Sequence, residues 1–159
     1  MTDNFRLLQE FLAHEVEFVV VGGVAAAFHG SSLTTYDLDL CIPFTEQNLG
    51  RVLPMLVRLH ARFRAHPAKP PLQADPKVYR DFRHLLLDTD LGAIDLLREI
   101  AGLGDFSQVL ACSQVLDQAE LPCRVLRLES LIVAKRAAGR DKDLRALPEL
   151  EILAAKMRT

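Results

Sequence analysis

The sequence has few cysteines, and they are not arranged in pairs. Its three cysteines, Cys41, Cys112 and Cys123, are widely spaced and odd in number, and no CxxC pair is present. Disulfide frameworks and structural zinc sites depend on paired or closely spaced cysteines. The spacing therefore argues against both, and it favours buried thiols in a reducing cytoplasm.

A basic leader and long apolar runs are also missing. The chain opens with Thr2, Asp3 and Asn4 rather than with a positive start followed by an apolar stretch, so no signal peptide is expected. Its apolar stretches fall far short of the roughly 20 residues that a membrane span needs. We therefore expect a cytoplasmic protein without a membrane partner.

Two common phosphate-binding sequences are absent. Gly22-Gly23 follows an apolar run, but no GxGxxG sequence is present and no Gly-Lys-Ser or Gly-Lys-Thr follows. This excludes the dinucleotide-binding fingerprint and the P-loop. The net charge of −2 argues against a surface that is basic all round, so any contact with nucleic acid would need a local patch.

The composition is that of an ordinary globular domain. Of the 159 residues, 50% are hydrophobic and 25% are charged, and this length suits one domain with a real core. We expect a single domain over residues 1–159, with its core within about 16–100 and a helical part at about 128–159.

Periodicity divides the first half of the chain into helices and short strands. The expected elements are helices over 3–15, 24–28 and 45–59 and strands over 18–21 and 37–42. The glycine pair Gly22-Gly23 is expected to break the first strand. Four prolines between residues 60 and 76 predict an irregular loop.

The second half predicts a hairpin followed by a helical C-terminus. The expected elements are a hairpin of 84–88 and 93–97, a short helix at 109–111, strands at 114–116 and 123–126, a helix at 128–138 and a last helix from 141. Gly139 ends the first of the two C-terminal helices, Asp141 caps the second, and Pro148 should kink or restart it. The fold class is α/β (α+β), a small mixed sheet flanked by helices.

Two aspartates stand two residues apart in a predicted strand. Side chains alternate along a strand, so Asp37 and Asp39 share one face while Leu38 and Leu40 point into the core. Carboxylates held side by side repel each other, and either a proton or a hard cation relieves the repulsion. Asp95 lies alone in an apolar strand, where an unpartnered acid is costly. A third carboxylate beside the first two would complete a site for two Mg²⁺ ions.

Each of these signals also has an ordinary explanation. Asp37 and Asp39 could lie on the solvated edge of a strand, and Asp95 could cap a helix or join a buried ion pair. The glycine pair is compatible with a plain strand-to-helix turn. It raises the odds of phosphate binding, because glycines let backbone amides approach closely and a helix start favours anions.

The run from Gly22 to Asp39 resembles the signature of nucleotidyltransferases of the DNA polymerase β superfamily. It is most similar to the bacterial branch that contains abortive-infection toxin and minimal nucleotidyltransferases. In that branch a glycine pair, a helix ending in His-Gly, a threonine and a DxD pair follow one another. The corresponding residues are Gly22, Gly23, His29, Gly30, Thr35, Asp37 and Asp39, with Asp95 as the third acid. The segments 128–135 and 139–144 also match.

The resemblance implies a reaction and a set of ligands. A nucleoside monophosphate (NMP) would pass from a nucleoside triphosphate (NTP) to an acceptor hydroxyl, with two Mg²⁺ ions on the three acids. The nucleotide-binding residues would be Gly22, Gly23, Thr35, Lys135, Arg140 and Lys142. Lys135 could instead be a surface lysine, and Arg140 and Lys142 could form a cap cluster with Asp143. His29 is expected to be a core or turn residue. Leu33 replaces an arginine that is usual in the branch.

A basic stretch at residues 58–83 is the candidate acceptor surface. It holds seven cations and two acids, and its cations are Arg58, Arg62, Arg64, Lys69, Lys77, Arg80 and Arg83. A solvated loop and helix face is the ordinary explanation. As a binding surface it would suit RNA, tRNA foremost, or a protein in a toxin–antitoxin context with a cognate partner. The alternatives are an enzyme that modifies an antibiotic and a nucleotide-binding, antitoxin-like partner with little turnover.

Overall fold

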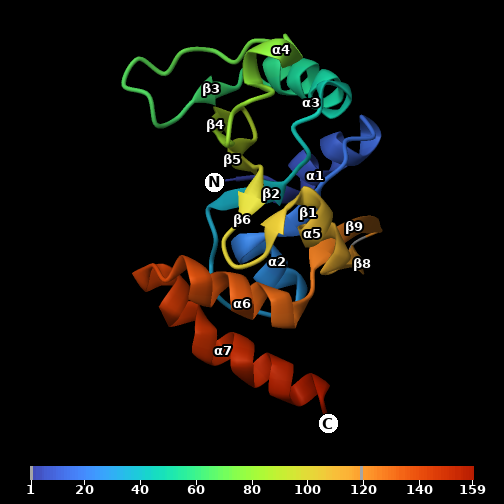
Figure 1. Ribbon diagram of the computed structural model, residues 1–159, viewed down its shortest axis with the longest axis vertical. Coiled ribbons are helices and arrows are strands. Elements are labelled where there is room, and N and C mark those ends of the chain that lie inside the picture. Colours follow the sequence, from blue (N-terminus) through green and yellow to red (C-terminus); the bar gives the residue numbers. More distant parts are fainter. Residues whose placement is uncertain (1, 119) are drawn as a thin grey trace.

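The computed structural model describes residues 2–118 and 120–159. The helices are α1 (Asn4–Ala13), α2 (Gly22–Phe28), α3 (Glu46–Arg58), α4 (Pro76–Tyr79), α5 (Phe106–Ala111), α6 (Leu128–Ala138) and α7 (Asp141–Met157). The strands are β1 (Val19–Val21), β2 (Asp37–Cys41), β3 (Arg62–Phe63), β4 (His84–Thr89), β5 (Gly92–Leu97), β6 (Glu99–Ile100), β7 (Gly104–Asp105), β8 (Ser113–Gln118) and β9 (Leu121–Leu126). Figure 1 shows the sheet at mid-height, with α3, α4 and the proline-rich loop at one end and α6 and α7 at the other.

One mixed sheet organises the chain. Its strand order is β3-β4-β5-β2-β1-β9-β8, and β6 and β7 form a separate two-stranded ribbon. β2 runs parallel to β5 and β1 runs parallel to β9, whereas the other neighbours are antiparallel. The predicted α/β class, with a mixed sheet and a helical C-terminus, is confirmed. The predicted hairpin is also confirmed as β4 and β5.

Strand alternation separates the core from the acids. Leu38 and Leu40 of β2 are fully buried, as are Ile94 and Leu96 of the neighbouring β5, while Asp37 keeps partial exposure on the opposite face. Removing one such leucine would cost about 2–5 kcal/mol, because a cavity would remain in a close-packed interior. The apolar residues of β2 and β5 therefore fix these strands rigidly beneath the acids.

The start of α2 differs from the prediction. Gly22 and Gly23 were expected to lie outside the helix, but α2 begins at Gly22. Gly22 has a φ of 66°, in the left-handed region that glycine adopts without strain. The chain can therefore turn from β1 into α2 without an intervening loop.

The proline-rich segment is less irregular than predicted. It contains β3, whose residues Arg62 and Phe63 pair with Asp88 and Leu87 of β4. The Phe63 amide donates to the Pro70 carbonyl oxygen at 3.0 Å. Pro71 forms an isolated β-bridge with Arg62, and none of the four prolines lies within β3 or β4, so the strand forms despite them.

The last helix differs from the prediction at its start. α7 runs from Asp141 to Met157 as one helix that contains Pro148, so it does not restart there, and a kink at Pro148 stays a prediction. Its N-cap is Arg140 rather than Asp141, and the Arg140 amide donates to the Asp143 carboxylate at 3.3 Å. Leu144, whose carbonyl oxygen loses its helical donor at Pro148, is half exposed, so water can satisfy that oxygen.

The loop between α2 and β2 is tied to the C-terminal helix. The Ser32 amide donates to one carboxylate oxygen of Glu149 at 2.6 Å, and the Ser32 hydroxyl donates to the other at 2.8 Å. These hydrogen bonds hold the pKa of Glu149 below its usual value. His29, just before this loop, makes a 2.8 Å hydrogen bond between its Nε2 and the Leu126 carbonyl oxygen, which fits the structural role predicted for it.

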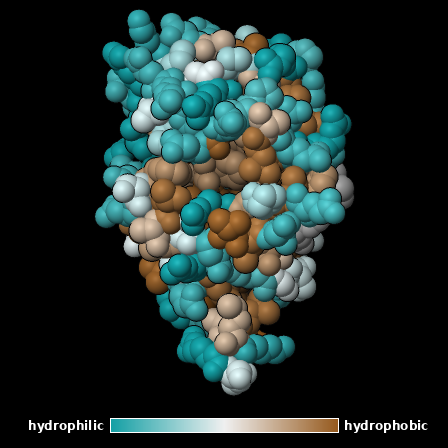
Figure 2. Space-filling view, turned by 90° about the vertical axis from the view of Figure 1, so that its right-hand side faces the viewer, coloured by the Kyte–Doolittle hydropathy of each residue, from teal (hydrophilic) through white to brown (hydrophobic). Residues whose placement is uncertain are grey.

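Apolar and polar side chains are unevenly distributed over the surface. Figure 2 shows apolar side chains gathered at mid-height on one face, while the upper end is mostly hydrophilic. Within the described part of the chain, no helix combines the length and the apolar character that crossing a bilayer requires.

Candidate functional site

The parallel pairing of β2 with β5 sets two of the acids side by side. The Cα of Asp39 is the register partner of the Cα of Asp95, and Asp37 is the partner of Ala93. Residues opposite one another on neighbouring strands point to the same face, and so do residues two apart on one strand. All three predicted acids therefore rise from one face of the sheet.

Asp39 is the most perturbed of these acids. Burial, followed by the charges of Asp95 and Asp37, raises the pKa of Asp39 to about 7, while the charge of Lys142 acts in the opposite direction. A hydrogen bond between the Asp39 and Asp95 side chains adds to the rise. The charge of Lys142 therefore does not outweigh burial and the two neighbouring carboxylates at Asp39, and the group of acids has the electrostatic character of a cation site.

The glycine pair makes room for this site. A Cβ atom on Gly22 would overlap the carboxylate of Asp39, and a Cβ atom on Gly23 would lie 2.6 Å from the Thr35 hydroxyl oxygen. The Thr35 hydroxyl in turn donates to the Asp37 carbonyl oxygen at 3.1 Å. Both glycines are therefore required by side chains of the site itself, whatever ligand approaches their amides.

Two of the predicted nucleotide-binding cations are organised by one buried acid. Asp143 is 2% exposed, and its carboxylate lies 2.7 Å from the Arg140 Nε and 3.6 Å from the Lys135 Nζ. Burial alone would raise the pKa of Asp143, but the hydrogen bond and charge of Arg140 and the charge of Lys135 outweigh it and lower the pKa. The predicted cap cluster of Arg140, Lys142 and Asp143 is confirmed for Arg140, whereas the second cation paired with Asp143 is Lys135 rather than Lys142.

Eight of the nine predicted site residues line one hollow of about 220 Å³. They are Gly22, Gly23, Thr35, Asp37, Asp39, Lys135, Arg140 and Lys142. A second hollow of about 180 Å³ continues from it past Leu97 and Ile100 and shares Gly22, Asp39, Lys135 and Arg140. The structure thus places residues from both halves of the chain around one space, which we call the nucleotide hollow.

Asp95, the ninth residue, is held by a cation that the sequence did not single out. The guanidinium of Arg64 forms an ion pair with the Asp95 carboxylate, and its other nitrogen donates to the Leu87 carbonyl oxygen at 2.8 Å. Arg64 directly follows β3, the edge strand of the sheet. Its amide donates to the Leu86 carbonyl oxygen of β4 at 3.0 Å, so its side chain can reach Asp95 on the next strand, β5. One of the two alternatives considered for Asp95, a place in an ion pair, is therefore realised.

The acids fit divalent cations by chemistry, although they do not form a ready-made cage. Asp37, Asp39 and Asp95 offer hard oxygen donors, and Asp39 is short of compensating charge. Among residues 2–118 and 120–159, no three His, Cys, Asp or Glu side chains are close enough together to hold an ion as they stand. Binding would therefore need side-chain adjustment at these acids.

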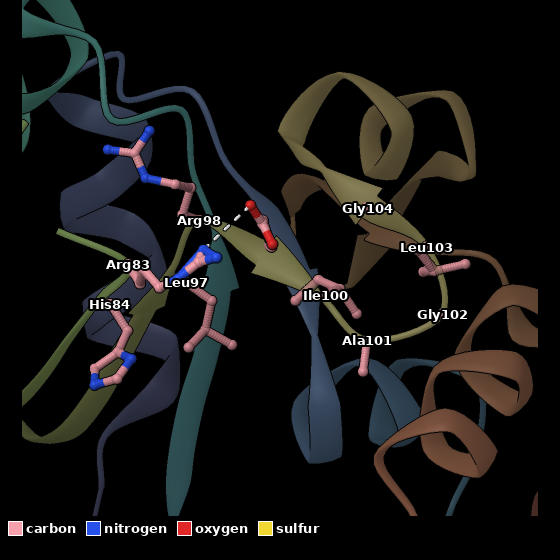
Figure 3. A pocket seen from close by; sticks show the side chains of 10 residues that line it. Arg83, His84, Leu97, Arg98, Ile100, Ala101, Gly102, Leu103 and Gly104 are labelled. Atoms are coloured by element: carbon pink, nitrogen blue, oxygen red, sulfur yellow. Dashed lines mark ion pairs between the residues drawn. The ribbon is translucent and has the colours of Figure 1, made fainter. Parts of the chain in front are cut away.

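Several cations of the basic stretch 58–83 are paired with acids that lie outside it. Arg80 pairs with Glu46 at 2.8 Å and Arg83 pairs with Glu99 at 3.6 Å, in addition to the pair made by Arg64. Acids from outside the stretch thus offset much of its excess of basic over acidic residues. Arg83 and Glu99, which form this ion pair, both line a hollow of about 500 Å³ that Figure 3 shows from close by.

The two residues that the sequence did not identify as organisers are Arg64 and Asp143. Arg64 was one of seven similar cations, and only the pairing of β3 with β4 selects it. Asp143 follows Arg140 by three residues, a spacing that is common at helix starts and gives no sign of contact with Lys135. Both depend on contacts between distant segments.

Comparisons with known proteins support the fold. No protein-family model matches the sequence, and no curated protein matches it. Among solved structures, a candidate nucleotidyltransferase of Thermotoga maritima shares 15% identity with a TM-score of 0.59, over 94% of each chain. ANT(2″)-Ia, solved in complex with adenylyl-2″-tobramycin, also shares 15% identity with a TM-score of 0.59, over 99% of this chain and 98% of its own.

A third structure extends the likeness to a fungal protein. An antigenic nucleotidyltransferase-like protein of Paracoccidioides brasiliensis shares 14% identity with a TM-score of 0.53, over 91% of this chain and 71% of its own. At these identities the likeness concerns the backbone. The chain has the nucleotidyltransferase fold, as its sequence motifs predict.

Proposed function

We propose that this protein transfers an NMP from an NTP to an acceptor hydroxyl. The observation that carries the proposal is the nucleotide hollow, in which two aspartates of β2 face Lys135, Arg140 and Lys142 across the glycine turn. Carboxylates and cations around one small space match the two needs of this reaction. One need is metal coordination, and the other is neutralisation of a triphosphate.

The chain's own residues would bind and orient the NTP. Lys135 and Arg140 are fixed by Asp143, so they meet phosphate oxygens without losing much side-chain freedom. Lys142, close enough to Asp39 to affect its pKa, would contact the same phosphates. The glycine turn leaves the space in which the triphosphate tail would lie.

Mg²⁺ ions on Asp37, Asp39 and Asp95 would neutralise the triphosphate and lower the pKa of the acceptor hydroxyl. Asp95 lies on the side of Asp39 toward β4 and, unlike Asp37 and Asp39, does not line the hollow that contains Lys135, Arg140 and Lys142. We therefore assign Asp95 to the acceptor side and Asp37 and Asp39 to the NTP side. Asp95→Asn should then keep NTP binding and lose most of the transfer.

The acceptor that we propose is RNA, with tRNA foremost, or a protein, in the cytoplasm and in a toxin–antitoxin context with a cognate partner. The basic stretch supports this reading only in part, because Arg80 and Arg83 are paired with acids. An antibiotic acceptor is the alternative, and the similarity in fold to ANT(2″)-Ia favours it. A nucleotide-binding partner with little turnover is the third candidate.

One experiment tests the reaction. The protein is incubated with each α-labelled NTP, Mg²⁺ and a cell extract, and transfer of label to any molecule is measured. Asp39→Asn should abolish transfer, whereas Asp117→Asn, an exposed acid on β8 at the far edge of the sheet, should leave it unchanged. If no NTP gives labelling, or if both variants label alike, the proposal is wrong.

A further inference from the structure

An apolar hollow of about 560 Å³ lies beside Asp95, and none of its lining residues is among those that we assign to NTP binding. Its lining residues are Phe63, Ala65, His66, Pro70, Pro71, Gln73, Val78, Tyr79, Phe82, His84 and Leu86. They come from β3, the proline-rich loop, α4 and β4. We call this space the aromatic hollow.

The strand register places the aromatic hollow next to Asp95. Leu86, in its wall, is the antiparallel partner of Asp95, and such partners have Cβ atoms about 4.5–5.5 Å apart on the same face. His84 also lines the hollow crossed by Arg83 and Glu99, and it pairs with Leu97, which borders the nucleotide hollow. His84 and Leu86 therefore connect these spaces along the face of β4 that carries the acids. Phe63, whose register partner Leu87 is buried in the core, borders the aromatic hollow from the other face of the sheet.

Aromatic side chains in the walls of the hollow pack against one another. The ring centroids of Phe63 and Tyr79 are 5.8 Å apart, and those of Tyr79 and Phe82 are 5.2 Å apart with the rings at 90°. The Tyr79 hydroxyl accepts a hydrogen bond of 2.9 Å from the Gln73 amide, which fixes the loop against α4. The cavity is thus held open by packed aromatic rings.

Part of this apolar surface is exposed to solvent. Phe82 is 42% exposed and Val78 is 39% exposed, and both line the hollow. Clustered apolar side chains at the mouth of a cavity mark ligand sites more often than scattered ones do.

The charges around the hollow restrict what it can hold. Its lining residues, all of them described by the structure, include two histidines and no acid. In the adjoining hollow, Glu99 is already paired with Arg83, and Arg98 adds a further cation. A polycationic ligand would find no free carboxylate here, whereas an uncharged planar ring matches the aromatic walls.

We propose that the aromatic hollow binds an uncharged planar ring of the acceptor, next to the hydroxyl that receives the NMP. A nucleoside unit and an aryl glycoside both have this chemistry, and a polycationic aminoglycoside does not. The inference rests on the proposed function, because a ring beside Asp95 would belong to the acceptor only if the protein transfers an NMP to an acceptor there. Ring binding itself requires neither metal nor NTP.

The test uses saturation-transfer NMR on the intact protein without metal or NTP. The probes are adenosine, phenyl β-glucoside and tobramycin. We expect saturation of the ring protons of the first two and none for tobramycin. The ring signal should fall at least about five-fold in Phe82→Ala and in Val78→Ala, two independent changes at exposed positions. It should persist in Val115→Ala, an exposed apolar residue on β8 at the opposite edge of the sheet.

The outcomes separate the sources of the ring and the two proposals. If the signal is stronger for adenosine, the ring bound in the aromatic hollow is a nucleobase. If it is stronger for phenyl β-glucoside, the bound ring belongs to an aryl small molecule. The inference would be overturned if the ring signal fell equally in Val115→Ala, or if it were retained in both Phe82→Ala and Val78→Ala. It would also be overturned if tobramycin protons were saturated as strongly as the ring protons. Mg²⁺-dependent ATP binding, measured separately by calorimetry, tests the nucleotide hollow. Each proposal can therefore fail while the other holds.

Discussion

The guanidinium of Arg64 is paired with the carboxylate of Asp95, so a built-in cation already occupies one acid of the candidate metal site. Arg64 and a divalent ion would compete for the same oxygens. Arg64→Gln should therefore raise the affinity of the protein for Mn²⁺ several-fold, as measured by the loss of the free-ion EPR signal at pH 8. Arg62→Gln, on the same strand but bonded to the Lys69 carbonyl oxygen, is the matched control.

The effect should disappear when Asp95 is also removed. In an Asp95→Asn background, Arg64→Gln should change Mn²⁺ affinity little, because the shared partner is gone. Weaker Mn²⁺ binding in the single Arg64→Gln variant would mean that Arg64 holds Asp95 in a binding-competent position, contrary to this prediction.

The raised pKa of Asp39 predicts that the metal-free protein loses stability as the pH rises. The folded protein keeps the Asp39 proton up to a pH of about 7, whereas the unfolded chain releases it near 3.8. Between these values the folded state binds more protons, so this group makes the free energy of unfolding fall with increasing pH and level off above about 7.

Urea unfolding in EDTA at several pH values measures this dependence. Asp39→Asn should lose this contribution and should be more stable than the parent at pH 8, with the difference shrinking toward pH 4. Parallel curves for the two proteins would contradict the assigned pKa. Added Mg²⁺ should stabilise the parent more than the variant at pH 8, because the ion replaces the proton.

The glycine turn gives a stability prediction with an internal control. Gly22→Ala should destabilise the fold by about 1–3 kcal/mol, because the left-handed backbone is strained with a side chain and the new Cβ would overlap Asp39. Gly50→Ala, within α3, would meet nothing closer than 3.9 Å and should stabilise by up to about 1 kcal/mol. Thermal melts that rank the two variants in the other order would disprove this account of the turn.

Two of the three cysteines, Cys41 and Cys123, should be unreactive in the folded protein. Burial raises the pKa of the Cys41 thiol to about 12 and that of Cys123 to about 11, with smaller effects from Asp105 and Asp117. At pH 8 neither should react with iodoacetamide in the folded protein, because the thiolate is the reactive form. Mass spectrometry of peptides should find both labelled only after unfolding in denaturant. Rapid labelling of Cys41 in the native state would contradict its burial in β2.

The sequence predicts the acids well because their spacing depends on local periodicity. Asp37 and Asp39 alternate with leucines, so their shared face follows from strand geometry alone. Gly139 likewise ends α6 as predicted, with its backbone in the left-handed region. The start of α2 was missed because a helix can begin directly at a left-handed glycine.

Contacts between distant segments could not be predicted in the same way. The pairs of Arg64 with Asp95 and of Lys135 with Asp143 join residues that no short pattern relates. The basic stretch looks unbalanced in sequence because its partner acids, such as Glu46 and Glu99, lie outside it. Charge counted along a chain is a poor guide to charge on a surface when ion pairs cross between elements.

The nucleotide hollow draws its acids from β2 and its cations from residues 135–142, two segments far apart in the sequence. A nascent chain must therefore extend past Lys142 before the two sets of charges can meet. A fragment that ends before α6 would keep Asp37 and Asp39 but would lack Lys135, Arg140 and Lys142. Neither part of the chain could then assemble the hollow alone.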